Sequence, residues 1–423
     1  MSHKLADLMK KMQKEHGPGS FKVASDTDPY CPRIPTGIFS LDYAMGGGIP
    51  IGRTSMFYGK RSAGKSAACA KTAANAQRLC RKCYGRVITQ DKEVTVERKT
   101  VDLITGKMQV TEEKIVKKIP VDCVNKCRVV VEGKKVFPGR MQVIWVDAEG
   151  TFTPDFYMKF GVDCDDLMLA TPDYGEAAVD MVDSAIRLRA VDLIIVDSIA
   201  HLTPLKEREG STEDSLVAVQ ARLVNRAMRQ WTSSLNEVES NKENDCAILL
   251  VNQIREKMGG FYTAEVRPGG MGQAFATSLD IHLWQKDFKY DSTGRPLWMT
   301  SKFIVEKNRV SVPKMEGTYR MCLLDHPGRL AGDTWDDEAV ADAVLDRGFA
   351  TFDDKGGVAV IGRMFASSDE FRAEIAKRED FYYEAREAVL NFMIYQPSDG
   401  KLAEKKKKGD KDSKDDKDEP KEE

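Results

Sequence analysis

The chain is 423 residues long and 42% hydrophobic, which is enough apolar material for one large domain with one or two small ones. Its 64 basic and 66 acidic residues leave a net charge of −2, so a nucleic-acid partner would need a local basic surface. No run of about 18 apolar residues is present, which excludes a membrane-spanning helix. The nine cysteines are an odd number and five are scattered singly, which predicts buried thiols in a reducing compartment rather than a disulfide framework.

The N-terminal piece, residues 1–35, begins with an amphipathic stretch. Leu5, Leu8, Met9 and Met12 recur at helical spacing, and no apolar region of the signal-peptide kind is present. The stretch ends at a Gly-Pro-Gly sequence, which predicts the end of a helix. Such an apolar stripe needs a partner surface. Periodicity alone leaves open whether that surface belongs to the same domain or to a neighbouring subunit.

A phosphate-binding loop of the form G-x-x-x-x-G-K-S begins at Gly59. Residues 53–58 are typical of a strand that enters such a loop, and the Ala-rich residues 66–79 are typical of the helix that follows it. Glycines let several backbone N–H groups point at one anion, Lys65 can reach the β- and γ-phosphates, and Ser66 can ligate Mg²⁺. The predicted nucleotide-binding residues are Gly59, Lys60, Arg61, Ser62, Ala63, Gly64, Lys65, Ser66 and Ala67.

Residues 80–139 interrupt the pattern that follows the loop and are predicted to form an inserted lobe. Alternating apolar and polar residues on both sides of a Thr-Gly turn at 105–106 indicate a β-hairpin. Two cysteine pairs bracket the hairpin: Cys80 with Cys83, and Cys123 with Cys127. Four thiolates on a lobe with little core are typical of a structural, zinc-ribbon-like Zn²⁺ site, and four free thiols are the alternative.

The core alternates apolar strands with helices. Residues 142–146, 193–196 and 247–251 are uninterrupted apolar runs, which predicts an α/β fold with a mostly parallel sheet covered on both faces. In such sheets ligands gather at the carboxyl ends of the strands. The polar residues at these ends are Glu149, Asp197 and Gln253.

Each of these three residues has a chemical interpretation. Asp197 can hold a Mg²⁺-bound water beside the phosphate loop, with a helix or turn cap as the alternative. Glu149 can polarise the attacking water, with a surface turn acid as the alternative. Gln253 can sense the γ-phosphate through its amide and pass that state into the segment after it.

Two regions are candidates for single-stranded nucleic acid. Residues 256–273 are too long and Gly-rich for an ordinary connection, and they mix cations with aromatics. A helix before them carries arginines at i, i+4 and i+7 on one face. A plain surface loop and a solvated helix face are the respective alternatives. The candidate residues are Lys257, Phe261 and Arg267 in the loop, and Arg222, Arg226 and Arg229 on the helix.

The C-terminal part divides into a lobe and a tail. The lobe is expected to contain helices near 337–347 and 380–394 and a short hairpin around 354–357. The tail contains almost no apolar residues and is expected to be disordered. The expected organisation is an N-terminal piece (1–35), an ATPase core (36–79 and 140–333), an inserted lobe (80–139), a C-terminal lobe (334–396) and a tail (397–423).

Seven motifs occur in a fixed order along the chain. They are residues 36–42 (TGIFSLD), the phosphate loop, 146–149 (VDAE), 193–204 (LIIVDSIAHLTP), 207–210 (EREG), 251–255 (VNQIR) with 269–270 (GG), and 307–309 (KNR). In this combination the chain resembles bacterial RecA and its phage relatives of the UvsX type. The resemblance covers roughly residues 1–79 and 140–395.

The resemblance implies a RecA-like P-loop ATPase core and an ATP-driven DNA recombinase. Such a protein forms a helical filament on single-stranded DNA and exchanges that strand into homologous duplex DNA. It works in the cytoplasm of a bacterial or phage-infected cell, alongside single-strand-binding and loader proteins. The rival interpretations are a RecA-like ATPase of helicase or regulatory type and a non-enzymatic single-strand-binding protein.

The resemblance also implies residue roles. Lys65, Ser66 and Asp197 would bind MgATP, Glu149 would activate water, and Gln253 would couple the γ-phosphate to DNA. The N-terminal helix would pack on the next protomer. Lys307 and Arg309 would reach ATP on the neighbouring subunit. DNA would be contacted by Arg222, Arg229, Arg255, Lys257, Gly269 and Gly270.

Three departures from the family pattern stand out. Phe156 occupies the adenine-stacking position, where the family usually has Tyr, so stacking is kept and any hydroxyl contact is lost. Thr153 stands where the bacterial proteins have an acid. The cysteine-flanked lobe has no counterpart in ordinary bacterial RecA.

Overall fold

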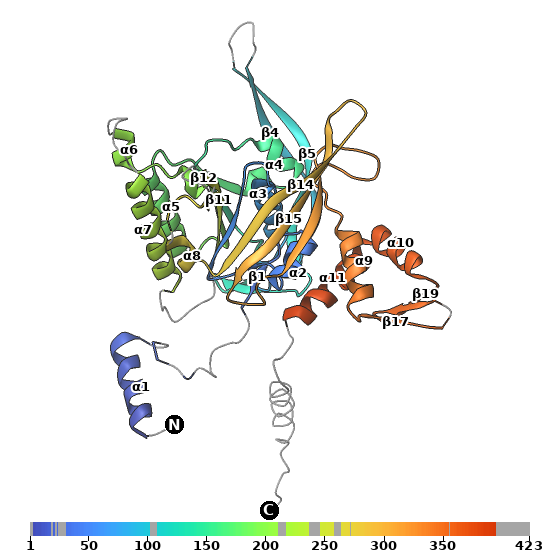
Figure 1. Ribbon diagram of the computed structural model, residues 1–423, viewed down its shortest axis with the longest axis horizontal. Coiled ribbons are helices and arrows are strands. Elements are labelled where there is room, and N and C mark those ends of the chain that lie inside the picture. The colour runs from blue at the N-terminus through green and yellow to red at the C-terminus, as the bar shows by residue number, and fades with distance from the viewer. Residues whose placement is uncertain are drawn as a thin grey trace, which may run out of the picture. The chain divides into compact units, whose positions relative to one another are not determined.

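The structure is a computed structural model of the chain (Figure 1), and its contacts define two units, Met1–Ala339 and Val340–Glu423. It describes residues 3–17, 20–21, 23, 31–101, 108–209, 217–236, 246–257, 264–270, 272–354 and 356–394. The tail 397–423, the turn at 105–106 and Phe261 lie outside the described residues. The expected domain boundaries stay predictions.

The centre of the first unit is an eight-stranded sheet. Its strands are β3 (Thr54–Gly59), β8 (Val143–Asp147), β9 (Leu167–Ala170), β10 (Leu193–Asp197), β11 (Ala247–Gln253), β14 (Leu279–Tyr290), β15 (Pro296–Asn308) and β16 (Glu316–Cys322). Their order in space is β16-β15-β14-β3-β11-β10-β8-β9. The strands from β14 to β9 run parallel, and β15 and β16 extend one edge antiparallel. The predicted α/β class with a mostly parallel sheet is confirmed.

Helices cover both faces of this sheet, which is why the parallel strands are apolar along their length. Along β10, Leu193 and Ile195 join the core of one face, whereas Ile194 and Val196 join the core of the other. By contrast, β15 alternates buried with half-buried residues through much of its length. The helices are α2 (Phe39–Met45) and α3 (Lys65–Ala76) on the first face, and α5 (Gly175–Leu188) and α7 (Val217–Leu235) on the second.

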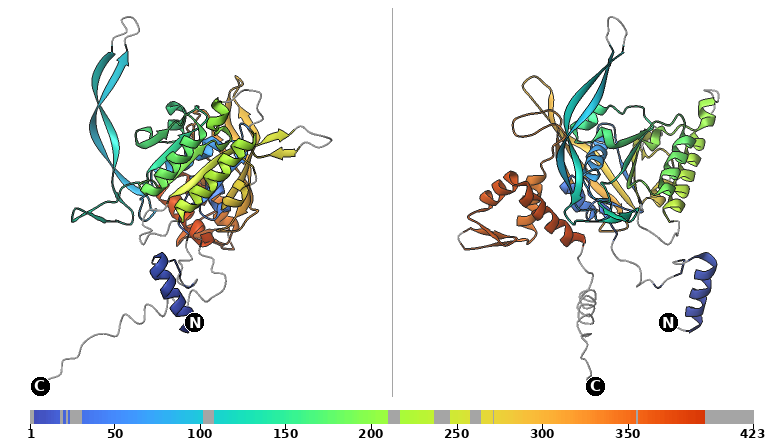
Figure 2. Two further views of the ribbon diagram at one scale, coloured as in Figure 1. Left: turned by 90° about the vertical axis from the view of Figure 1, so that its left-hand side faces the viewer. Right: turned by 180° about the vertical axis from the view of Figure 1, so that it is seen from behind.

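The inserted lobe leaves the core after α3 and returns before β8. Its main feature is a long twisted ribbon of two antiparallel strands, β4 (Val87–Val101) and β5 (Met108–Cys123), which Figure 2 shows clearly. A second hairpin follows, made of β6 (Val129–Val131) and β7 (Lys134–Val136). The predicted inserted hairpin lobe is confirmed.

Short elements complete the first unit. The N-terminal helix α1 (His3–His16) forms as predicted. The others are β1 (Arg33–Ile34), β2 (Ile49–Pro50), α4 (Pro154–Lys159), η2 (Cys164–Asp166), η3 (Ile199–His201), α6 (Leu205–Glu209), β12 (Arg255–Lys257), β13 (Ala264–Val266) and α8 (Gly272–Ala276). Within the described residues, no helix has the length and apolarity needed to cross a bilayer.

The C-terminal part has its own small core. Phe371 and Phe381 are fully buried there, with their ring centroids 6.0 Å apart. Ser367 caps a helix by accepting a hydrogen bond from the Glu370 amide at 3.2 Å. The elements are α9 (Asp336–Asp346), β17 (Ala350–Phe352), β18 (Val358–Val360), β19 (Arg363–Phe365), α10 (Ser368–Lys377) and α11 (Glu379–Ile394).

Candidate nucleotide-binding site

The phosphate loop joins the end of β3 to the start of α3, at the carboxyl edge of the parallel strands. Gly64 caps α3 with a φ of 87°, a conformation in which a Cβ is strained. A Cβ on Gly59 would collide with the carbonyl oxygen of Leu283. The first amides of α3 have no partner within the helix by geometry, and they point toward the loop. This arrangement fits a phosphate group.

The residues predicted to hold MgATP lie together where the phosphate loop meets the start of α3 and the end of β10. Lys65 is buried, its Nζ donates to the carbonyl oxygen of Lys60 at 2.7 Å, and burial lowers the pKa of its ammonium group. Asp197 accepts a hydrogen bond from the Ser66 side chain, and burial raises the pKa of this carboxyl to about 6. A hydroxyl and a carboxylate are oxygen donors of the kind Mg²⁺ prefers, and the lysine compensates phosphate charge.

The loop after β8 is folded around the carboxylate of Asp147. Its Oδ1 accepts hydrogen bonds from the amides of Glu149, Gly150 and Thr151 at 3.2, 2.8 and 3.2 Å. Its Oδ2 accepts a hydrogen bond from the amide of Phe152 at 2.8 Å. This turn chemistry reverses the chain within a few residues and fixes the backbone of Glu149 next to the phosphate loop.

The side chain of Glu149 is held through one oxygen. Its Oε1 accepts hydrogen bonds from Gln253 Nε2 at 2.7 Å and Ser198 Oγ at 2.8 Å, and lies 2.8 Å from His201 Nδ1. Ser198 Oγ and His201 Nδ1 are themselves 2.9 Å apart. The structure therefore brings Glu149, Asp197 and Gln253 to one edge of the sheet, as the sequence predicted, and adds two residues to them.

Phe156 lies on α4 with 44% of its surface exposed. Its ring packs edge-on against Tyr157 and Phe160, with centroid distances of 5.3 and 4.9 Å. Tyr157 is buried and stacks on Phe152 at 4.1 Å, and burial raises the pKa of its hydroxyl far above the usual range. The exposed ring of Phe156 is suited to stacking on a base, but that role stays a prediction.

The three arginines predicted to track a DNA backbone lie on α7. Arg222, Arg226 and Arg229 are all exposed, and the residues between them, such as Val224 and Met228, are buried. The spacing therefore presents three cations to solvent on one face, and their contact with DNA stays a prediction.

The second predicted DNA segment begins as a hairpin of β12 and β13, an element that the sequence analysis did not predict. Arg255 is exposed on β12, and the backbone of Lys257 ends that strand. Arg267 is instead turned toward the core, where its guanidinium lies 3.1 Å from Asp280 Oδ2 and 3.5 Å from the ring centre of Tyr58.

Gly269 and Gly270 lie against α7 rather than on an open surface. Their φ values are 88° and 77°, and a Cβ on Gly269 would lie 3.0 Å from Val224. A Cβ on Gly270 would lie 3.4 Å from Ala221. In this structure the lack of a side chain at both glycines lets residues 269–270 pack closely against α7. Their predicted contact with DNA stays a prediction.

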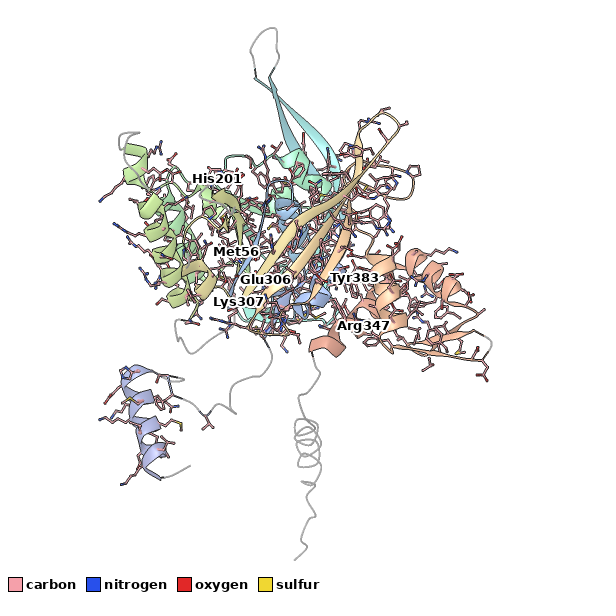
Figure 3. The ribbon with its side chains drawn as sticks, in the orientation of Figure 1. Met56, His201, Glu306, Lys307, Arg347 and Tyr383 are labelled. Atoms are coloured by element: carbon pink, nitrogen blue, oxygen red, sulfur yellow. The ribbon has the colours of Figure 1, made fainter. Side chains whose placement is uncertain are left out.

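Lys307 and Arg309 lie at the end of α8, away from the phosphate loop of their own chain. Lys307 Nζ donates to the carbonyl oxygens of Ala274, at 2.6 Å, and Thr277. Arg309 donates to the carbonyl oxygen of Phe275 at 3.2 Å. Cations at a helix C-terminus satisfy its free carbonyl groups. Figure 3 shows Lys307 and His201 at different ends of the sheet.

The four predicted metal ligands form one cluster. The Sγ atoms of Cys80, Cys83, Cys123 and Cys127 all lie within 4.8 Å of one another. Those of Cys83 and Cys123 are 3.8 Å apart, which equals the edge of a tetrahedron with Zn–S arms of about 2.3 Å. Burial raises the pKa of Cys80 to about 11. The donor set and its spacing fit a closed, four-thiolate Zn²⁺ site.

The parallel sheet, the phosphate loop and the carboxylates at its edge define a P-loop nucleotide-binding protein. A family model described as "RecA N-terminal domain" matches residues 3–100 and 127–323, and the chain belongs to the RecA family. The unmatched residues 101–126 lie within the inserted lobe. The resemblance inferred from the motifs is confirmed.

Curated relatives named "Protein RecA" agree with this assignment. One from Mesomycoplasma hyopneumoniae is 38% identical over 173 residues, which is 40% of this chain and 48% of the relative. One from Streptomyces coelicolor is 30% identical over 305 residues, 71% of this chain and 64% of the relative. One from Haemophilus ducreyi is 29% identical over 315 residues, which is 74% of this chain and 67% of the relative. The chain thus spans about half to two thirds of the length of these relatives.

Three residues at the site were not found from the sequence. Asp147 carried a usable signal, because an Asp followed by Gly within a few residues after a strand is typical of a side-chain-capped turn. Ser198 and His201 carried none, since nothing in their spacing shows that they turn toward Glu149.

Proposed function

We propose that this protein is an ATP-dependent DNA recombinase that forms a helical filament on single-stranded DNA and exchanges that strand into homologous duplex DNA. The observation that carries the proposal is the hydrogen bond from Gln253 Nε2 to Glu149 Oε1, 2.7 Å long. Glu149 lies next to the phosphate loop, and Gln253 ends the strand that leads into β12. One amide therefore joins the acid proposed to act on water to the segment proposed to touch DNA.

ATP and Mg²⁺ are the proposed cofactors of the loop. Bound MgATP supplies the phosphoanhydride bond and part of the charge compensation. The loop amides and Lys65 hold the phosphates, Ser66 and Asp197 provide oxygen ligands for the metal, and Glu149 orients and deprotonates water. The exposed ring of Phe156 stacks on the adenine.

Single-stranded DNA is proposed to bind the surface formed by α7 and the β12–β13 hairpin. The exposed cations Arg222, Arg226, Arg229 and Arg255 supply phosphate contacts. Lys257 and Phe261 are further candidates for contact with the DNA. Arg267 can reach DNA only if it leaves Asp280 and Tyr58, so its contact depends on movement of the segment.

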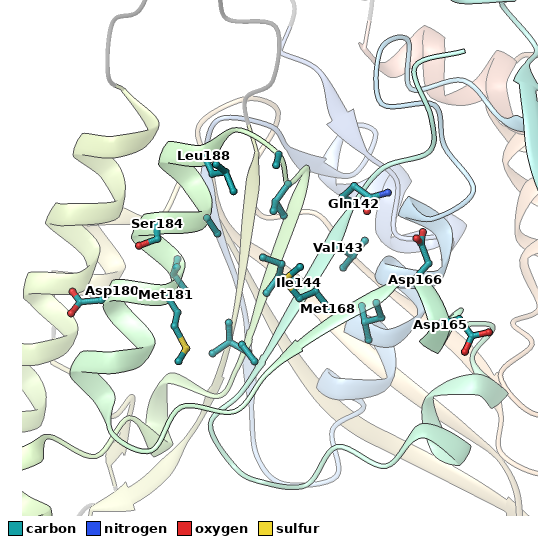
Figure 4. A pocket seen from close by; sticks show the side chains of 17 residues that line it. Gln142, Val143, Ile144, Asp165, Asp166, Met168, Asp180, Met181, Ser184 and Leu188 are labelled. Carbon is teal, nitrogen blue, oxygen red and sulfur yellow. The ribbon is translucent and has the colours of Figure 1, made fainter. Parts of the chain in front are cut away.

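Self-assembly is proposed to use an apolar groove between β9 and α5, shown in Figure 4. Met168 and Leu188 line it and are 63% and 74% exposed, which is unusual for such large apolar side chains. The proposed occupant is α1 of a neighbouring protomer, whose Leu5 and Leu8 are also exposed. Charge fits at one point as well, because Asp180 lines the groove and is exposed, and α1 is rich in lysine.

Zn²⁺ is the proposed ion of the four-cysteine cluster. All four ligands are thiols and their spacing suits a tetrahedron, so no position is left open for a substrate. The proposed role is structural, because the lobe consists of thin hairpins whose exposed side chains include Val116 and Val130.

Strand exchange by purified protein tests the proposal. Wild-type protein with ATP is expected to pair single-stranded DNA with homologous duplex, and Lys65→Ala is expected to lose this activity because phosphate charge is left poorly compensated. Lys377→Ala, an exposed lysine of the second unit, is the matched control and should behave as wild type. Strand exchange by Lys65→Ala at the wild-type rate would end the proposal.

Negative-stain images with ATP and single-stranded DNA separate the proposal from its rivals. Helical filaments support a recombinase. Closed rings would instead indicate an ATPase of helicase or regulatory type, and irregular coats that form without ATP would indicate a single-strand-binding protein.

A further inference from the structure

One oxygen of Glu149 is the meeting point of groups from two neighbouring strands. Gln253 reaches Oε1 from the end of β11. Ser198 and His201 reach the same oxygen from the turn that follows β10, at 2.8 Å each. Ser198 and His201 have no role assigned so far, because neither residue belongs to the phosphate loop or to the predicted metal ligands.

The hydrogen atoms in this cluster can be assigned from its geometry. Glu149 Oε1, Ser198 Oγ and His201 Nδ1 form a triangle with sides of 2.8, 2.9 and 2.8 Å. A carboxylate only accepts, and the serine hydroxyl has one hydrogen, which can serve one side. If Nδ1 carried no proton, its lone pair would face the carboxylate with no hydrogen between them. Nδ1 of His201 therefore carries a hydrogen, for which Glu149 Oε1 and Ser198 Oγ are the two acceptors in reach.

His201 is also joined to the first predicted DNA region. It ends η3, and Gln220 of α7 donates to the carbonyl oxygen of its neighbour Ala200 at 2.8 Å. The chain then passes through α6 and returns as α7, which carries the three exposed arginines. Gln253 is likewise joined to the second predicted DNA region, because that region begins with β12, just after Gln253 in the chain.

We propose that His201 is a positioning residue for ATP hydrolysis, the counterpart of Gln253 on the side of α7. By donating from Nδ1 to Oε1, it fixes the carboxylate of Glu149 and leaves Oε2 for the attacking water. The inference rests on the proposed function, since it takes Glu149 as the group that acts on water. His201 itself touches no reacting atom.

The test compares two substitutions at one position. His201→Ala removes the donor, whereas His201→Asn keeps an N–H close to the place of Nδ1. In the presence of single-stranded DNA, His201→Ala is expected to lower kcat for ATP hydrolysis about tenfold and to leave KM for ATP within about twofold, as for a lost charge-assisted hydrogen bond. His201→Asn is expected to recover most of kcat.

Two results would overturn the proposal. One is a His201→Ala protein that hydrolyses ATP at or above the wild-type rate. The other is a folded His201→Asn protein that is as slow as His201→Ala, since a restored donor would then be without effect. Thermal unfolding and nucleotide affinity are measured on each protein, and His201→Leu replaces His201→Ala if the latter does not fold.

A third variant separates this inference from the function on which it rests. Glu149→Gln should abolish most hydrolysis, and adding His201→Ala to it should cause little further loss, because both act through one carboxylate. If Glu149→Gln hydrolyses ATP at the wild-type rate, the proposed base is wrong. If Glu149→Gln is inactive but His201→Ala is normal, only the role of His201 is wrong.

Discussion

Asp197 is a carboxyl group that the fold keeps from water at the edge of the sheet. Burial raises its pKa to about 6, and Glu149 and Asp147 add like charge, while the Ser66 hydrogen bond and Lys65 act in the opposite direction. The folded protein thus binds a proton at this group more tightly than the unfolded chain, where the pKa is about 3.9. The contribution of Asp197 to the free energy of unfolding is fully present below about pH 4 and is lost as the pH rises through about 6.

We therefore expect Asp197→Asn to stabilise the nucleotide-free protein at about pH 8 by up to about 3 kcal/mol, and to have little effect at about pH 4. The amide has no charge to bury, so the gain should follow the ionisation of the wild-type carboxyl. Thermal unfolding measured across this pH range without Mg²⁺ checks the prediction. A difference in melting temperature that does not change with pH would argue against it. The same variant should lose the stabilisation that MgATP gives to wild type.

At the scale of elements, the sequence was most informative where a pattern is local. The apolar runs placed β8, β10 and β11 to within a residue or two, because strands buried on both faces must be apolar throughout. The β12–β13 hairpin was missed because its Gly-rich sequence carries no alternation. Arg267 was expected to face DNA, but in the structure it contacts Asp280 and also Tyr58 of β3, which is distant in sequence.

The inserted lobe gives a prediction at the same scale. Protein purified in reducing buffer without chelator should contain about one zinc per chain, since four clustered cysteines have the donors and spacing that a closed tetrahedral site requires. Cys80→Ser/Cys123→Ser should lose the metal, and the lobe should become sensitive to proteases. Cys164→Ser, outside the cluster, is the matched control. Elemental analysis that finds less than about a tenth of an equivalent in wild type would rule out the zinc site.

At the scale of the whole molecule, Lys307 and Arg309 are informative because they lie away from the phosphate loop of their own chain. In the chain itself they hold the carbonyl groups at the end of α8, which follows the second predicted DNA segment. The family resemblance implies that they reach ATP on an adjacent protomer, and this role stays a prediction. A cation supplied in this way stabilises transition-state charge and makes hydrolysis depend on assembly.

We expect Lys307→Ala/Arg309→Ala to bind ATP but to show no DNA-stimulated hydrolysis. Mixed with Lys65→Ala, it should regain part of the activity, because each variant keeps the half-site that the other lacks. ATPase assays on titrated mixtures check this. If mixtures that co-assemble on DNA stay as inactive as either variant alone, the two cations do not complete a shared site.

The inserted lobe leaves and re-enters the core at one place. Leu79 pairs with Arg86, Cys80 pairs with Arg140, and the amide of Met141 donates to the carbonyl oxygen of Leu79 at 2.9 Å. The inserted lobe can therefore be added or removed without changing the order or connections of the strands in the central sheet. A segment with such ends can be gained, lost or exchanged in a single genetic step, and a family with this core can acquire new surface chemistry while the catalytic edge of the sheet is inherited unchanged.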